Sequence, residues 1–323
     1  MKYLLKIGLA LVNATFLICC GHTNNPVNGE TVDAVSRNSI YYWKTSFNID
    51  LTEMSFLQRH NISRVYLRMF DVAIEQNYQT GSTDIVPIAT TKFVSSVPKN
   101  VEIVPVTYIT IDALRAMIGR EVEFASLIVE RLLAMSSYNE CGKISEIQLD
   151  CDWTNSTKSS YSRLCQMVKN SLLSKNIELS ITVRLHQLQE APPPADRGVL
   201  MLYNTGALKN PGTKNSILDI ADAVPYIKPI KYAIPLDYAY PLFGWGVKFE
   251  NNKFVSIVSA DSCTSSNGEH IRYERPAPAE ILSVKELVEQ NLGKPTRGNI
   301  LYHLDNSQLK NYTNDEINQI LSF

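Results

Sequence analysis

The stretch that decides the fold is ISEIQLDC (144–151), followed after a short polar link by KSSYSRLCQMVKNSLLS (158–174). The first segment is short and rich in Ile and Leu, which is typical of a strand. In the second segment apolar residues recur at the i, i+3, i+4 spacing of one helix face, at Tyr161, Leu164, Cys165, Val168 and Leu172. One strand followed by one helix is the repeating unit of an α/β protein.

The same unit recurs along the chain. Further strands are predicted at 39–43, 64–70, 102–109, 178–184, 199–204, 230–236 and 299–304. Further helices are predicted near 119–136, 216–223, 284–291 and 314–321, the last capped by Thr313 or Asn314. Alternation of single strands with helices predicts a parallel sheet, and eight strands predict its closure into a single (β/α)8 TIM barrel.

The connection after the seventh predicted strand is about sixty residues long. Within it, Asn251-Asn252 separates two short runs at 248–250 and 253–258. This pattern predicts a β-hairpin insertion, and long loops at the carboxyl ends of barrel strands usually form the walls of a site.

Composition limits the partners. The 323 residues are 45% hydrophobic and 20% charged, which predicts a globular protein rather than a disordered one. The formal net charge of −1 gives no electrostatic footprint for nucleic acid, so we expect none as a partner. It gives none for an anionic membrane surface either, so we expect membrane contact through a lipid anchor only.

The beginning of the chain has the pattern of an export signal. Lys2 and Lys6 flank the start of an apolar run at 7–18, which is too short for a transmembrane helix. The ending Leu17-Ile18-Cys19-Cys20 resembles a bacterial lipobox, which implies acylation of Cys20, for example with palmitate. The alternative is an ordinary signal peptide with incidental cysteines.

These features predict the domain organisation and the location. We expect a lipoprotein signal peptide at 1–19, a polar tether at 20–37 and the barrel domain at 38–323. The protein would be exported and lipid-anchored in the bacterial cell envelope, with the outer membrane as the favoured site.

The four remaining cysteines match no zinc-binding spacing: Cys141, Cys151, Cys165 and Cys263. Cys151 and Cys165 fall on apolar faces, which favours buried free thiols over disulfides. A metal site formed by Asp150, Asp152, His186 or His303 is the less favoured alternative, because no His-x-His or His-x-x-x-His spacing supports it. We therefore expect no metal and no cofactor.

Polar and ionisable side chains follow most of the predicted strands. They are Asp71, Asp150, Asp152, Arg184, His186, Asn204, Asp237, His303 and Asp305. Aromatic residues are interleaved with them: Trp43, Trp153, Tyr203, Tyr238, Tyr240 and Trp245. Carboxylates beside flat apolar faces suit sugar rings, which stack through C–H groups and need acceptors for their hydroxyls. The alternative is a polar barrel rim with ordinary capping acids.

Asp150-Cys151-Asp152 is the most informative of these strand ends. Residues two apart on a strand share a face, so both aspartates are predicted to point into the barrel while Cys151 points outward. Two carboxylates so close together raise one pKa, as a general acid requires. In a structural alternative, Asp150 pairs with Arg184 on the next strand. We expect both roles, with Asp152 nearer the substrate.

These residues resemble glycoside hydrolase family 18, the chitinase-type barrels. Ile147-Gln148-Leu149-Asp150-Cys151-Asp152-Trp153-Thr154 is similar to the fourth-strand pattern Asp-Gly-x-Asp-x-Asp-x-Glu. Met201-Leu202-Tyr203-Asn204 resembles the sixth-strand Met-x-Tyr-Asp/Asn, and 231–238 followed by Trp245 is similar to the seventh-strand segment. Residues 298–302 loosely resemble the eighth strand, with Tyr302 where Trp is usual. The chain also resembles uncharacterised barrel lipoproteins of gut-type bacteria.

The chain departs from the family at the catalytic position. Thr154 stands where the resemblance places the catalytic Glu, and threonine cannot protonate a leaving oxygen at neutral pH. The resemblance still implies that Asp150, Asp152 and Tyr203 orient an acetamido group. The proton would have to come from another acid, such as Asp237, Glu190 or Asp71.

Two hypotheses for a glycan partner follow. The favoured one is a glycoside hydrolase-like enzyme with a non-standard acid, in which Asp152 works with Asp237 across the barrel. The other is a catalytically inactive barrel that binds carbohydrate at the cell surface. Thr154 and the predicted lipid anchor are the features that favour it.

Overall fold

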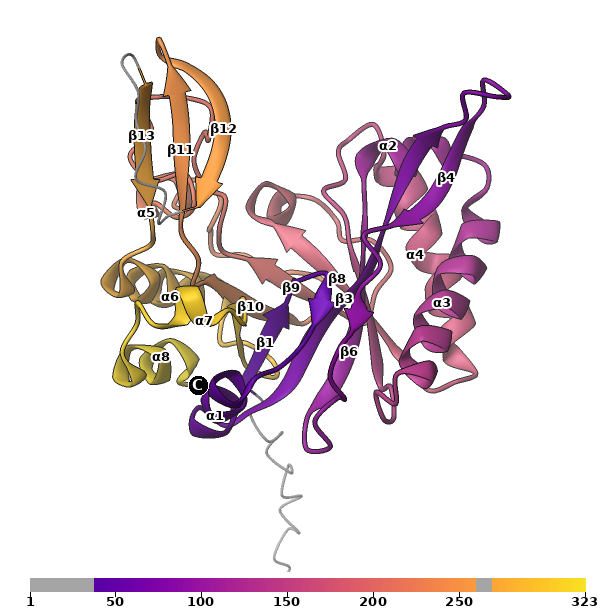
Figure 1. Ribbon diagram of the computed structural model, residues 1–323, viewed down its shortest axis with the longest axis horizontal. Helices are drawn as coiled ribbons and strands as arrows, with labels where there is room; N and C mark the ends of the chain where they lie inside the picture. Colours follow the sequence, from indigo (N-terminus) through magenta and orange to yellow (C-terminus); the bar gives the residue numbers. More distant parts are fainter. Residues whose placement is uncertain (1–37, 260–268) are drawn as a thin grey trace, which may run out of the picture. The chain divides into compact units, whose positions relative to one another are not determined.

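The computed structural model describes residues 38–259 and 269–323. Eight parallel strands close into a barrel, because β1 pairs with β3 on one side and with β14 on the other. This confirms the predicted TIM barrel (Figure 1). The barrel strands are β1 (Asn38–Tyr42), β3 (Ile62–Gln76), β6 (Glu102–Ile109), β7 (Glu146–Asp150), β8 (Glu178–Arg184), β9 (Arg197–Met201), β10 (Leu236–Pro241) and β14 (Asn299–Tyr302).

Strand alternation separates two cores. On β7, Ile147 and Leu149 belong to the outer core, between the barrel and its helices. Gln148 and Asp150 face inward, and Tyr41 on β1 donates its hydroxyl proton to Gln148 across the lumen at 2.7 Å. The lumen is filled mainly by aromatic and branched side chains, so it is a packed core rather than a channel.

The outer layer consists of helices that bury one face. The helices are α1 (Leu51–Arg59), α2 (Ile111–Ala116), α3 (Glu121–Tyr138), α4 (Lys158–Leu173), α5 (Ile220–Ala223), α6 (Pro278–Leu292), α7 (Asn306–Leu309) and α8 (Asn314–Leu321), with a 3-10 helix at Leu185–Gln189. The predicted apolar stripe of α4 is buried, and the Thr313 hydroxyl caps α8 by accepting from the Glu316 N–H. Within the described ranges, no helix has the length and apolar character needed to span a bilayer.

The predicted hairpin insertion is confirmed, with one strand more than expected. β11 (Trp245–Glu250) and β12 (Lys253–Ser259) meet at Asn251 and Asn252, whose φ values of 48° and 62° suit asparagine in a tight hairpin turn. The unexpected strand β13 (Glu269–Glu274) pairs with the other edge of β11. The resulting three-stranded sheet forms one of two additions to the barrel (Figure 1).

The second addition was not predicted. β3 runs beyond the barrel and pairs with β4 (Thr83–Ile88) as an antiparallel hairpin, so Asp71 lies within the strand rather than after it. A further short parallel pair is formed by β2 (Ser46–Phe47), which follows β1, and β5 (Lys92–Phe93), which follows β4.

The seventh barrel strand lies later in the chain than predicted. The expected segment was 230–236, whereas β10 begins at Leu236. Pro229 precedes the expected segment and Pro235 lies within it, and neither has an N–H group for a sheet ladder. The carbonyl of Pro235 accepts from Gly198, and regular pairing with β9 begins only with Leu236.

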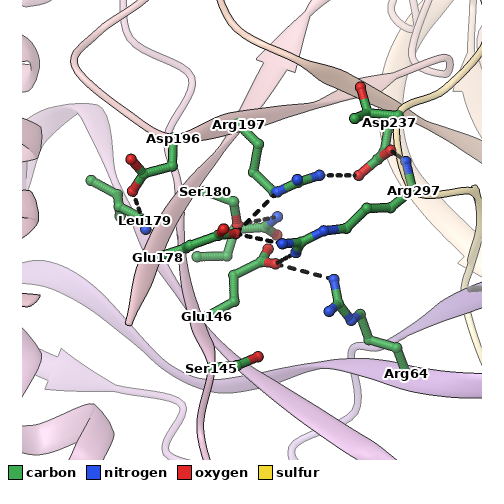
Figure 2. A network of polar contacts seen from close by, with 12 residues as sticks. Arg64, Ser145, Glu146, Glu178, Leu179, Ser180, Asp196, Arg197, Asp237 and Arg297 are labelled. Carbon is green, nitrogen blue, oxygen red and sulfur yellow. Dashed lines mark hydrogen bonds and ion pairs between the residues drawn. The ribbon is translucent and has the colours of Figure 1, made fainter. Parts of the chain in front are cut away.

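The amino ends of the strands carry a network of ion pairs (Figure 2). Glu146 at the start of β7 is fully buried and binds Arg64 at 3.1 Å and Arg297 at 2.8 Å. Arg297 also reaches Glu178 at 2.7 Å, and Arg197 binds Asp237 at 2.9 Å. Burial raises the pKa of Glu146, and the neighbouring guanidinium groups oppose this shift. The charges thus compensate one another at this end of the barrel.

Removing one cation from this network is expected to destabilise the fold. Arg64→Ala leaves Glu146 buried with one partner fewer, so we expect the free energy of unfolding to fall by about 3–5 kcal/mol in urea denaturation. The matched control is Arg115→Ala, which breaks the exposed pair with Asp112 and should cost about 0–1 kcal/mol. Equal losses in the two variants would contradict this role for the network.

Candidate functional site at the carboxyl end of the barrel

Asp150 and Asp152 are held by one arginine. Asp150 ends β7 at 5% exposure and accepts from the Thr182 hydroxyl at 2.6 Å and from Arg184 Nη2 at 3.0 Å. Arg184 Nε also donates to Asp152, whose side chain is 41% exposed. Thr182 and Arg184 come from β8, where they are two apart and share the inward face. The structural pairing of Asp150 with Arg184 is therefore present.

The electrostatics of this group follow from its depth. Burial raises the pKa of Asp150, and the negative charge of Asp152 adds to the shift while Arg184 opposes it. The two carboxylates in turn raise the pKa of Arg184, so its guanidinium stays charged. Cys151 points away from the lumen into the outer core, which also contains Cys165. Both are buried free thiols, as is Cys141.

Two adjoining pockets open at this end of the barrel. We call the first the polar pocket; it has a volume of about 220 Å³ and is lined by Asp152, Arg184, Leu185, His186, Tyr203, Asn204, Thr205 and Tyr226. We call the second the aromatic pocket; it has a volume of about 320 Å³ and is lined by Tyr203, Asn204, Phe243, Gly244, Trp245, Tyr302, His303, Asp305 and Gln308. Because Tyr203 and Asn204 line both, the two pockets are neighbours.

Tyr203 forms the boundary between the pockets. Its ring lies 4.8 Å from the ring of Tyr302 and 5.8 Å, edge to face, from that of Phe243. Asn204 follows with a φ of 57°, a left-handed conformation that asparagine tolerates better than most residues. Trp43 lies 5.8 Å from Tyr302 and so extends the same aromatic cluster.

Trp245 is fixed in the wall of the aromatic pocket by a buried acid. Its indole Nε1 donates to Glu274 at 2.8 Å, and Arg272 Nε donates to the same carboxylate at 2.6 Å. The Ser216 hydroxyl is a third donor at 2.5 Å. Glu274 therefore ties β11 and β13 to the loop after β9, and the orientation of Trp245 depends on all three segments.

His303 lies in the aromatic pocket as a neutral side chain. Burial lowers its pKa to about 4 from the ordinary 6.5; Asp305 opposes this shift, and Lys44 adds to it. Its Nδ1 atom is buried without a hydrogen-bond partner. The aromatic pocket is thus lined by a neutral imidazole beside its aromatic rings.

The structure brings together most of the predicted site residues, namely Asp150, Asp152, Arg184, His186, Tyr203, Asn204, Trp245 and Trp43. Asp71 lies in β3 and forms an ion pair with Arg68, whose guanidinium also lies over the Trp43 ring. Trp153 is present at the same end but is only 2% exposed.

Three predicted positions are wrong. Asp237 is the second residue of β10 and lies at the amino end, bound to Arg197, so it cannot face Asp152 across a site. Tyr238 and Tyr240 point into the outer core, and the Tyr238 hydroxyl donates to the carbonyl of Gly293 at 2.7 Å. All three errors have one cause, which is that the strand begins later than predicted.

Sequence reasoning missed Phe243 and Glu274. Phe243 and Trp245 flank Gly244 directly after an apolar strand, and this pairing of aromatic residues could have indicated a site wall. Arg272 and Glu274 lie two apart, as partners on one strand face do, but β13 itself was not predicted. Among the described residues, no three His, Cys, Asp or Glu side chains gather in a way that could hold a metal ion.

The buried neutral imidazole gives a pH dependence. Between pH 6.5 and about 4 the unfolded state binds a proton at His303 that the folded state does not, so stability is lost as pH falls through this window. We expect His303→Asn to weaken this dependence when urea denaturation is followed from pH 7 to pH 5. The control is His270→Asn at an exposed position; a wild-type slope in His303→Asn would contradict the assignment.

Comparison with known proteins supports the fold. No family model matches the sequence, and no curated protein matches it. Among solved structures, a chitinase from Chromobacterium violaceum ATCC 12472 has a TM-score of 0.54 at 13% identity, over 90% of this chain and 100% of that one. The spore cortex-lytic enzyme SleL of Bacillus megaterium QM B1551 has a TM-score of 0.54 at 13% identity, over 90% and 75%. The family 18 chitinase ChiB of Flavobacterium johnsoniae has a TM-score of 0.51 at 12% identity, over 88% and 94%.

These identities are too low to carry activity, and they establish the architecture alone. The predicted resemblance is confirmed at that level: the chain has the TIM-barrel fold of family 18 chitinases and of spore cortex-lytic enzymes.

Proposed function

We propose that the chain binds oligosaccharides at the carboxyl end of the barrel. The observation that carries this proposal is the junction of the polar and aromatic pockets at Tyr203 and Asn204. Sugar rings need both kinds of surface, since their C–H faces stack on aromatic rings while their hydroxyls form hydrogen bonds. Trp245, oriented by Glu274, provides a rigid stacking surface.

The pairing of the acids favours binding over hydrolysis. A glycosidase needs a carboxylic acid that reaches the leaving oxygen. Asp150 and Asp152 share Arg184, Asp71 binds Arg68, and Glu190 binds Lys158 at 2.7 Å. Burial raises the pKa of Asp150, but its side chain is more deeply buried than that of Asp152 and accepts a hydrogen bond from the Thr182 hydroxyl.

Position 154 supports the same choice. The exposed Thr154 hydroxyl lies 3.0 Å from the Ser156 hydroxyl in the turn before α4. It can form hydrogen bonds but cannot act as a general acid near neutral pH. The binding barrel, the second hypothesis from the sequence, is therefore the function that this geometry supports best.

Chitin-type oligosaccharides are the first ligands to test, because several similar structures are chitinases. Hydrolysis remains the second candidate. Asp152 favours it, since its side chain is 41% exposed and lines the polar pocket.

Titration calorimetry with chito-oligosaccharides tests this function. We expect binding without release of reducing ends. Trp245→Ala removes the stacking surface and should weaken affinity by about tenfold or more. Tyr138→Ala, an exposed aromatic change on α3, is the control and should have no effect. Sustained release of reducing ends that Asp152→Asn abolishes would establish the hydrolase instead, and absence of binding to any glycan would refute the proposal.

We further propose that the barrel is displayed on the bacterial cell envelope by a lipid on Cys20. Residues 1–37, which include this cysteine, and Cys263 lie outside the described residues. The support is the sequence pattern of Lys2, Lys6, the apolar run at 7–18 and the lipobox-like ending.

The anchor has its own test. In cells fed an alkyne-tagged palmitate, we expect the wild-type protein to carry the label and to sediment with membranes. Cys20→Ser should lose the label and leave the membrane fraction, because a protein without acyl chains loses their partitioning energy. Cys19→Ser is the matched control. A labelled Cys20→Ser variant would contradict acylation at this position.

A further inference from the structure

An apolar groove lies between the β3–β4 hairpin and α3. It has a volume of about 480 Å³, and ten of its twelve lining residues are apolar. Phe70, Val72 and Ile85 line it from the hairpin, and Leu127 and Met135 line it from α3. None of the twelve lines the polar or the aromatic pocket, so this groove is separate from the site proposed for sugars.

The groove results from apolar side chains that the fold leaves partly uncovered. On α3, Phe124 and Ile128 are buried in the outer core. Leu127, Arg131 and Ala134 form a second stripe beside them, at the i, i+4, i+7 spacing of one helix face, and they line the groove. Leu127 is 50% exposed, so no described part of the chain covers this stripe. A concave apolar surface of this size is typical of a site for a small molecule.

Arg131 is the only cation among the twelve lining residues. Its guanidinium carbon lies over the Phe70 ring, 5.0 Å from the ring centroid, and its Nη2 atom donates to the Thr90 hydroxyl at 3.1 Å. No carboxylate among the described residues forms an ion pair with Arg131, and its Nε atom is buried without a hydrogen-bond partner. A guanidinium has five N–H donors and the contact with Thr90 uses one of them, so Arg131 can still bind an anion.

The size and charge of the groove select one class of ligand. A dry cavity of about 150 Å³ holds benzene, so about 480 Å³ suits an alkyl chain of roughly ten carbons or more. A carboxylate matches a guanidinium, because its two oxygens accept two parallel hydrogen bonds. Glu130, the second charged residue in the lining, is exposed, and its charge disfavours a head group with several negative charges.

A protein partner fits the groove less well. β4 pairs with β3 along one edge, so an extended peptide could add only at the other edge. Pro87 lies within β4 and has no N–H group to donate to an added strand. An apolar helix could fill the groove, but it would cover Arg131 without supplying an anion, which is costly for a buried charge.

We propose that this groove binds one free long-chain fatty acid, with the alkyl chain between the hairpin and α3 and the carboxylate at Arg131. The binding is non-covalent. It is independent of the proposed function, because the groove shares no residue with the two pockets at the carboxyl end of the barrel. The lipid proposed on Cys20 is a different group, since an acyl chain bonded to the protein has no free carboxylate for Arg131.

The experiment displaces dansyl-undecanoic acid, a fluorescent fatty acid, from the full chain carrying Cys20→Ser, so that no attached acyl chain competes. The competitors are hexanoate, octanoate, decanoate and dodecanoate. We expect affinity to rise by about two- to fourfold for each added methylene, because each one buries more apolar surface. Decan-1-ol has the chain length of decanoate without its charge, and it should bind about tenfold or more weakly than decanoate.

Further variants test the apolar and the charged part of the site separately. Ala134→Trp fills the groove from an exposed position on α3 and should weaken decanoate and decan-1-ol alike, by about tenfold or more. Arg131→Gln should weaken decanoate by about tenfold or more and leave decan-1-ol unchanged, while Arg131→Lys keeps the charge and should retain part of the affinity. Ser126→Trp, an exposed change on α3 outside the lining, is the matched control and should leave both affinities unchanged. Circular dichroism spectra establish that each variant is folded.

Four outcomes would overturn the proposal. Absence of displacement by every acid, or displacement that Ala134→Trp leaves unchanged, rules out a fatty-acid site in the groove. Equal affinities for decanoate and decan-1-ol that Arg131→Gln does not alter rule out recognition of the carboxylate. Flotation with phosphatidylglycerol vesicles that Ala134→Trp abolishes, without displacement by free acids, would assign the groove to a membrane surface instead. A dimer in sedimentation that Ala134→Trp dissociates, again without displacement by free acids, would assign the groove to a second copy of the chain.

Discussion

Closure of the sheet is the constraint on which the rest of this structure depends. Because β1 pairs with both β3 and β14, all eight strands point the same way around one lumen, and their carboxyl ends form one rim. Tyr41 on β1 and Gln148 on β7, which are 107 positions apart, form a hydrogen bond across the lumen because the sheet closes. Side chains two apart on a strand share a face, so closure also decides which of them reach the lumen.

Charge is compensated differently at the two ends of the lumen. At the amino end, Glu146 is fully buried and forms ion pairs with both Arg64 and Arg297, so this network has a structural role in the barrel. At the carboxyl end, Arg184 is shared by Asp150 and Asp152, and the group borders a pocket. A buried charge must find a partner in either place. At the carboxyl end, however, one partner is partly exposed, so this group can contact a ligand.

The additions to the barrel shape the site. The sheet of β11, β12 and β13 carries Trp245 into the aromatic pocket, and Glu274 fixes its orientation through bonds to the indole and to Arg272. The turn at 154–156 and the segment after β8 line a further pocket of about 500 Å³, which shares His186 with the polar pocket. The threonine at position 154 is compatible with the proposed binding of sugars, because stacking and hydrogen bonding need no proton donor.

The sequence by itself determined the barrel, because the apolar periodicity of short strands and helices is a local property. It can be recognised without knowing which segments are neighbours in space. It also determined the group of Asp150, Asp152 and Arg184, since strand alternation and adjacent strands predict which side chains meet. Only the tertiary structure decided the role of Asp237, which depends on where pairing with β9 begins after Pro235. It likewise decided the role of Glu274, whose three partners come from separate segments. Strand register and contacts between distant segments arise from packing, and no local pattern encodes them.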